Sequence, residues 1–173
     1  MTYNKVKEAL MIGQTMQDAI NEQINREFFS SYLYLSMAAY FEERNLPGFA
    51  HWMRLQADEE REHGMKLYEY LLERGGKVML RAIDAPTTEW ESSLAVFEEV
   101  AGHEAKVTAS IHELYELALA EKDYPAQVLL HWFISEQVEE ENNAAEILSN
   151  LKLVEKRGTA VLMLDHRLAK RGG

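Results

Sequence analysis

The stretch Ala57–Gly64, with the sequence ADEEREHG, places polar residues where a packed helix needs apolar ones. Counting from Glu60 at alternate intervals of three and four residues gives a stripe at heptad spacing. The stripe consists of Phe49, Met53, Gln56, Glu60, His63, Leu67 and Tyr70. Its apolar ends predict a core-facing helix, with Glu60 and His63 at the buried centre. Because a carboxylate or imidazole resists burial, we expect a compensating partner there.

Three other segments carry stripes of the same spacing, each with a polar residue close to its middle. The first consists of Ile20, Ile24, Glu27, Ser31, Tyr34, Ala38 and Phe41. The second consists of Phe97, Val100, Glu104, Val107, Ile111, Leu114 and Ala118. The third consists of Leu130, Phe133, Gln137, Glu140, Ala144, Ile147 and Leu151. Each long helix is therefore expected to place an acid or amide on its apolar face.

Gly, Pro and Asn interrupt the apolar period at few places, so few helices are expected. The expected helical segments are Gln14–Arg44, Pro47–Arg74, Ser92–Lys122, Asp123–Leu151 with Asp123 as N-cap, and the short Thr159–Lys170. Short connections make the first and second helices antiparallel, and likewise the third and fourth. Lys77–Trp90 lacks a helical period and is long enough to cross the bundle, which makes helices two and three parallel. The fold class is an all-α four-helix bundle with one long crossover and a short fifth C-terminal helix.

The composition limits the kind of protein and its partners. At 173 residues and 47% hydrophobic, the chain is expected to form one domain over residues 1–173, with an N-terminal extension of about residues 1–13. A net charge of -11 argues against nucleic acid or an anionic membrane as partner. The absence of cysteine excludes disulfides, thiolate zinc sites and iron–sulfur clusters. Without a secretory or membrane-spanning pattern, a cytoplasmic location is expected.

The polar residues of the four stripes should converge, because packed helices of similar length share their mid-height whichever way they run. The converging residues are Glu27, Glu60, His63, Glu104, Gln137 and Glu140. The inner stripes contain no Lys or Arg, so a bound cation is expected to neutralise the carboxylates. Carboxylates with few nitrogen donors favour iron or manganese over structural zinc, and about four negative charges match two divalent ions. Tyr34 could hydrogen-bond a ligand or supply an electron, and Trp132 is a second oxidisable neighbour.

Four motifs together resemble the non-haem ferritins of bacteria and archaea: INEQINREFFSSYLY at 20–34, ADEEREH at 57–63, His103-Glu104, and HWFISEQVEEE at 131–141. The resemblance covers about Met16 to Leu168. It implies a ferritin-like bundle that oxidises Fe(II) with O2 or H2O2 and stores ferric mineral in a homo-oligomeric shell of two dozen subunits. The fifth helix would line the four-fold axes of that shell.

The same resemblance implies roles for individual residues. Glu27, Glu60 and His63 would bind the first iron, Glu60 would bridge, and Glu104 with Glu140 would bind the second, with Gln137 near the oxygen side. A third iron site would consist of Glu59, Glu136, Glu139 and Glu140. Each of the first three precedes a residue of the dinuclear centre by one position and therefore points about a quarter-turn away.

Departures from related families argue against other cofactors. Bacterioferritins and rubrerythrins carry a second Glu-x-x-His motif, where this chain has Gln137-x-x-Glu140. Bacterioferritins place a haem-ligating Met at the position of Arg61, so no haem is expected. Rubrerythrins add a cysteine-ligated iron module, for which this chain has no cysteine.

Several alternatives stay open at the level of sequence. The chain could be a di-iron oxidase or peroxidase that acts on a small substrate, or a metal-free helical interaction bundle. Tyr34 could be an ordinary core tyrosine, and Glu59, Glu136 and Glu139 could be solvated charges. The histidines outside the stripes are expected at the surface or in satisfied core positions: His51, His103, His112, His131 and His166.

Overall fold

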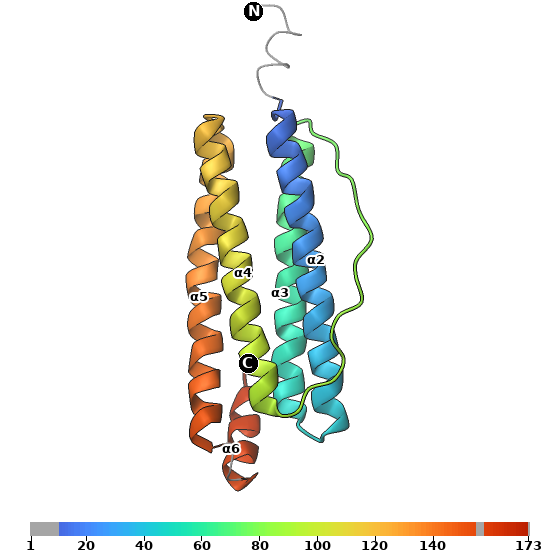
Figure 1. Ribbon diagram of the computed structural model, residues 1–173, viewed down its shortest axis with the longest axis vertical. Helices are drawn as coiled ribbons and strands as arrows, with labels where there is room; N and C mark the ends of the chain where they lie inside the picture. Colours follow the sequence, from blue (N-terminus) through green and yellow to red (C-terminus); the bar gives the residue numbers. More distant parts are fainter. Residues whose placement is uncertain (1–10, 155–157, 173) are drawn as a thin grey trace, which may run out of the picture.

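The computed structural model describes residues 11–154 and 158–172. These residues form five helices and no strands, and the helices are α2 (Gln14–Glu43), α3 (Pro47–Glu73), α4 (Ser93–Ala120), α5 (Tyr124–Val154) and α6 (Gly158–Leu168). Figure 1 shows four long helices side by side and the short α6 at one end of the bundle. The predicted all-α four-helix bundle with a short fifth helix is confirmed.

The topology follows from the lengths of the connections. Short turns join α2 to α3 and α4 to α5, and each of these pairs runs antiparallel in Figure 1. Residues 74–92 form an extended segment that follows α2 over the length of the bundle (Figure 1). Helices α3 and α4 therefore run parallel, and the predicted long crossover is confirmed.

The helix ends lie within three residues of the predicted ones. Ser92 caps α4 by accepting a hydrogen bond from the Ala95 N–H at 3.1 Å. Asp123 caps α5 in the same way, since its Oδ1 accepts from the Ala126 N–H at 3.1 Å. Helix α5 continues to Val154 rather than ending at Leu151, because no Gly or Pro follows until Gly158.

The N-terminal extension predicted over about residues 1–13 falls mostly outside the described residues. Residues 11–13 precede α2, and Ile12 is buried. The assignment of residues 1–173 to one domain stays a prediction.

The apolar core consists of two separate clusters of buried side chains. One cluster includes Phe41, Phe49 and Phe97, and it lies toward α6. The other includes Met16, Leu67 and Leu130, and it lies toward the opposite end of the four long helices. Each long helix contributes residues to both clusters. The polar residues at the middle of the stripes lie in the layer between the two clusters.

Helix α6 is fixed to the start of α3 by a buried hydrogen bond. The Phe49 N–H donates to Asp165 Oδ1 at 2.9 Å, so a carboxylate from α6 serves as the cap that Leu46 cannot supply. A Cβ on Gly48 would lie only 1.7 Å from the Asp165 carbonyl oxygen. The close approach of α6 to α3 therefore requires glycine at this position.

Candidate metal centre

The predicted ligands lie at mid-height and come from all four long helices. Helix α2 contributes Glu27, α3 contributes Glu60 and His63, α4 contributes Glu104, and α5 contributes Gln137 and Glu140. All six are buried, with relative exposures between 0% for Glu60 and 6% for Glu140. The heptad stripes explain this arrangement, because a residue on the inner face of one helix meets the inner faces of its neighbours.

Three of these residues come close enough to share one cation. Ligand atoms of Glu27, Glu60 and His63 all lie within 4.8 Å of one another, and His63 Nδ1 is 3.7 Å from Glu60 Oε2. Both side-chain oxygens of Glu60 and Oε2 of Glu27 have no hydrogen-bond partner among the described residues. Unpaired carboxylate oxygens in a protein interior are costly and rare, so these three atoms indicate a site for a cation.

The electrostatics of this cluster agree with that interpretation. Burial and the neighbouring Glu60 carboxylate raise the pKa of Glu27 well above its usual value. Burial and the carboxylate of Glu104 raise the pKa of Glu60 in the same direction. Protons or cations are therefore bound in preference to leaving these carboxylates charged and unpaired.

Glu104 and Glu140 lie outside the three-residue cluster but interact electrostatically with Glu60. Glu104 accepts hydrogen bonds from the Tyr34 hydroxyl and from the Gln137 amide, the latter at 3.2 Å. Burial raises the pKa of Glu104, and burial with the neighbouring Glu104 raises the pKa of Glu140 to about 7. Glu60 thus lies close to Glu27 and His63 and also interacts with two further carboxylates.

The donor set fits a hard or borderline cation. Four carboxylates and one imidazole offer mostly oxygen ligands, which suit iron and manganese, and His63 supplies one nitrogen. The described residues place no Lys or Arg side chain within the buried layer. A divalent ion that replaces the protons of these carboxyl groups would therefore meet oxygen ligands without a basic side chain of the described residues competing for them.

Tyr34 and Trp132 lie beside the centre, as the sequence predicts. Tyr34 is 1% exposed, and burial beside Glu104 raises the pKa of its hydroxyl well above the usual value, so it remains a proton donor. Trp132 packs edge-on against His63, with 5.4 Å between the ring centroids. The redox or hydrogen-bonding role of Tyr34 stays a prediction.

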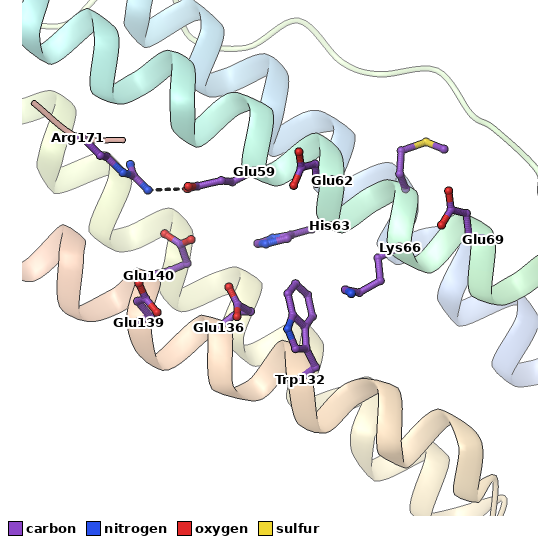
Figure 2. A pocket seen from close by; sticks show the side chains of 11 residues that line it. Glu59, Glu62, His63, Lys66, Glu69, Trp132, Glu136, Glu139, Glu140 and Arg171 are labelled. Atoms are coloured by element: carbon purple, nitrogen blue, oxygen red, sulfur yellow. Dashed lines mark hydrogen bonds and ion pairs between the residues drawn. The ribbon is translucent and has the colours of Figure 1, made fainter. Parts of the chain in front are cut away.

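The residues predicted for a third site surround an open pocket of about 450 Å³ next to the centre. Figure 2 shows Glu59 projecting from α3 and Glu136, Glu139 and Glu140 from α5. Glu59 and Glu136 are half-buried, Glu139 is exposed and Glu140 is buried. The same pocket also holds a basic residue from the C-terminal turn, Arg171, which pairs with Glu59.

The other histidines have ordinary environments. His103 is half-buried against Ser30, whose Oγ is 2.8 Å from its Nε2, and burial lowers the pKa of His103 to about 4. His131 contacts the Tyr115 hydroxyl, His51 contacts a backbone carbonyl, and His112 and His166 are exposed. Among the histidines that the structure describes, only His63 belongs to a group of side chains that could hold a metal.

Sequence reasoning missed three residues that support the centre. Gln23 donates from its amide to Glu27 Oε1 at 2.7 Å, and Gln56 donates to Glu140 Oε2 at 2.7 Å. Both precede a predicted ligand by four residues on the same helix face, and this spacing could have identified them. The third, Arg171, lies far along the chain and no local pattern indicates its place.

A four-helix bundle with one long crossover and a buried mid-height layer of carboxylates defines the class of ferritin-like metal-carboxylate proteins. The family described as "Ferritin-like domain" matches residues 17–154. The chain belongs to this family.

Relatives and solved structures support the same family over nearly the whole chain. The bacterial non-heme ferritin of Bacteroides fragilis is 42% identical over 161 residues, which cover 93% of this chain and 100% of the relative. The bacterial non-heme ferritin of Staphylococcus saprophyticus is 37% identical, with 93% and 96% covered. An open pore ferritin from the hyperthermophilic archaeon Archaeoglobus fulgidus is 48% identical, with a TM-score of 0.92 and 92% of this chain and 98% of that chain covered.

In the part of the chain that the structure describes, no helix is both long and apolar enough to cross a membrane.

Proposed function

We propose that this protein is the subunit of an iron-storage ferritin, in which Fe(II) is the substrate and is oxidised to Fe(III) within the bundle. The observation that carries this function is the group of unpaired, buried oxygens on Glu27 and Glu60 beside His63. A bundle evolved only for packing would not retain buried carboxylates without partners, because each costs several kcal/mol.

We assign the predicted ligands to a dinuclear centre. Glu27, Glu60 and His63 would hold one Fe(II), and Glu60, Glu104 and Glu140 would hold the other, with Gln137 near the site of the oxidant. The position of Glu60 supports the bridging role, since its ligand atom lies close to those of Glu27 and His63 while the carboxylates of Glu104 and Glu140 also raise its pKa. Gln23 and Gln56 would orient the carboxylates of Glu27 and Glu140 through their amide hydrogen bonds.

The reaction balances with either oxidant. Two Fe(II) ions each release one electron, and O2 takes both electrons with two protons to leave as H2O2. With H2O2 as oxidant, the two electrons and two protons yield two molecules of water. The protein's part is to hold both ions at one place. The Tyr34 hydroxyl donates a hydrogen bond to the Glu104 carboxylate beside them.

The finer features of storage are part of the same proposal. Fe(III) would leave through a third site at Glu59, Glu136, Glu139 and Glu140 toward the interior of a homo-oligomeric shell of two dozen subunits. The acidic pocket next to the dinuclear centre supports this route, because its carboxylates attract cations. We further propose that the ferric product is stored as oxide mineral and that the protein is cytoplasmic.

The alternatives have less support. An oxidase for an organic substrate needs an apolar cavity beside the metals, whereas the pocket next to this centre is lined mainly by charged residues. A metal-free interaction bundle would leave the oxygens of Glu60 without a partner.

The test is the substitution Glu60→Gln, which keeps the shape of the side chain and removes its charge. We expect the variant to lose fast Fe(II) oxidation while the assembled particle keeps its size. The oxidation is measured as the rise in ferric absorbance after mixing with O2. Asp58→Asn is the matched control, because Asp58 is exposed on the same helix. Oxidation by the Glu60 variant at the rate of the parent protein would disprove the assignment.

A further inference from the structure

Arg171 reaches from the C-terminal turn into the acidic pocket beside the dinuclear centre. Figure 2 shows its guanidinium directed toward Glu59, above Glu140 and Glu139. The turn that carries it follows α6, which the Asp165 hydrogen bond fixes to α3. The backbone of Arg171 is held as well, since its carbonyl oxygen lies 3.0 Å from His51 Nε2.

The guanidinium occupies one ligand atom that the third iron site would need, Oε2 of Glu59. Its Nη2 donates to Glu59 Oε2 at 2.5 Å, and its Nη1 donates to the side-chain oxygen of Gln56 at 2.8 Å. It also lies over the Trp52 ring, with 4.7 Å between Arg171 Cζ and the ring centroid. Its side chain is 23% exposed, so this is a partly desolvated pairing rather than a loose surface contact.

The same contacts extend to a residue shared by both proposed metal sites. Gln56 receives the guanidinium at its oxygen and donates from its nitrogen to Glu140 Oε2 at 2.7 Å. Arg171 therefore fixes the orientation of the Gln56 amide, and through it one oxygen of Glu140. Without the guanidinium, Glu59 would lose this partner and the side-chain oxygen of Gln56 would lose its donor.

We propose that Arg171 is the internal counter-cation of the third iron site, and that a metal ion occupies that site only by displacing the guanidinium from Glu59. This inference rests on the proposed function, because it takes Glu59, Glu136, Glu139 and Glu140 as metal ligands. Metal occupancy is thereby coupled to the contacts of the C-terminal turn, since the same side chain joins the two. Arg171 acts as a positioning residue and does not itself bind metal.

Charge removal should reveal the competition. Zn(II) is a suitable probe because it has the charge of Fe(II) and no redox chemistry. In the Arg171→Gln variant we expect Zn(II) to bind at Glu59 about tenfold more tightly. Repulsion between one unit charge and a divalent ion a few ångströms away has an effect of about this size even at the dielectric constant of water. Arg54→Gln is the matched control, because Arg54 is on α3 and pairs with Glu42 at an exposed position.

The measurement is Zn(II) titration of the assembled, metal-free protein by calorimetry, with zinc located by anomalous scattering in crystals. The inference requires tighter binding in Arg171→Gln, no change in Arg54→Gln, and loss of the gain in the double variant Arg171→Gln/Glu59→Gln. In zinc-loaded crystals of the parent, Arg171 should no longer contact Glu59. Equal affinities in the parent and Arg171→Gln, or a gain that persists without the Glu59 charge, would overturn it.

A separate titration tests the proposed function itself. If Glu60→Gln leaves zinc binding at the buried residues unchanged, the dinuclear assignment is wrong. The comparison of the parent with Arg171→Gln still decides the role of Arg171, because Glu59 and Arg171 lie outside the buried cluster.

Discussion

Glu140→Gln should stabilise the metal-free protein at neutral pH and remove the part of its pH dependence that Glu140 contributes. The pKa of Glu140 rises from its ordinary 4.5 to about 7 in the folded protein. The groups that face it are the carboxylates of Glu104 and Glu59, the Gln56 amide and the Arg171 guanidinium, and burial makes the largest contribution to the rise. A difference of about 2.5 pH units corresponds to about 3 kcal/mol of unfolding free energy.

The sign follows from which state loses its proton first. Below pH 4.5 the carboxyl is protonated in both states, and its stabilising effect is complete. As the pH rises toward 7, the unfolded chain deprotonates first, so the free energy of unfolding falls by about 3 kcal/mol and then stays constant. A glutamine at this position has no charge to bury, so the variant keeps this unfolding free energy as the pH rises.

Thermal unfolding followed by circular dichroism measures the effect. For a chain of this size about 3 kcal/mol corresponds to roughly 6–12 °C in Tm. We expect that increase for metal-free Glu140→Gln at pH 7.5, little difference at pH 4.5, and a smaller gain from added Zn(II) than in the parent. Glu116→Gln, at an exposed position of α4, is the control. A Glu140→Gln variant with the Tm and pH slope of the parent would refute the reasoning.

Two further substitutions test the surroundings of the centre. Tyr34→Phe removes a donor from buried Glu104 and should cost the metal-free protein about 1–3 kcal/mol, measured by denaturant unfolding; an unchanged midpoint would contradict the role of this bond. Gly48→Ala places a Cβ 1.7 Å from the Asp165 carbonyl oxygen and should detach α6, which limited proteolysis detects. Gly102→Ala is the control because nothing lies within 4 Å of its Cβ, and equal proteolysis of both variants would argue against the close α6 contact.

Much of the fold could be predicted because it depends on local patterns. The period of the stripes fixes the inner face of each helix, and Pro47, Ser92 and Asp123 mark helix starts that the structure retains. Residues 74–92 lack a period and are long enough to cross the bundle, and these two properties determine the topology. The period of the stripes also predicts the polar layer at mid-height, because a stripe shifted by one residue would expose Glu60 and His63.

The remaining details depend on contacts between distant residues. Gln56 is on the correct face by spacing, but its bond to Glu140 depends on how α3 and α5 are rotated relative to each other. Asp165 gives no sign in the sequence that it caps another helix, because its partner Phe49 lies 116 positions earlier. The contact of Arg171 with Glu59 depends in turn on that cap, and it could not be inferred without the docked position of α6.

The division of the core into two apolar clusters has a consequence for how the protein can vary. Side chains such as Phe41 and Phe97 pack among themselves, and Met16 and Leu130 pack in the other cluster. Substitutions at distant sites without shared partners add in their effects on stability. Each end of the bundle can therefore be redesigned, or drift during evolution, without repacking the other, provided that the charged layer between them is preserved.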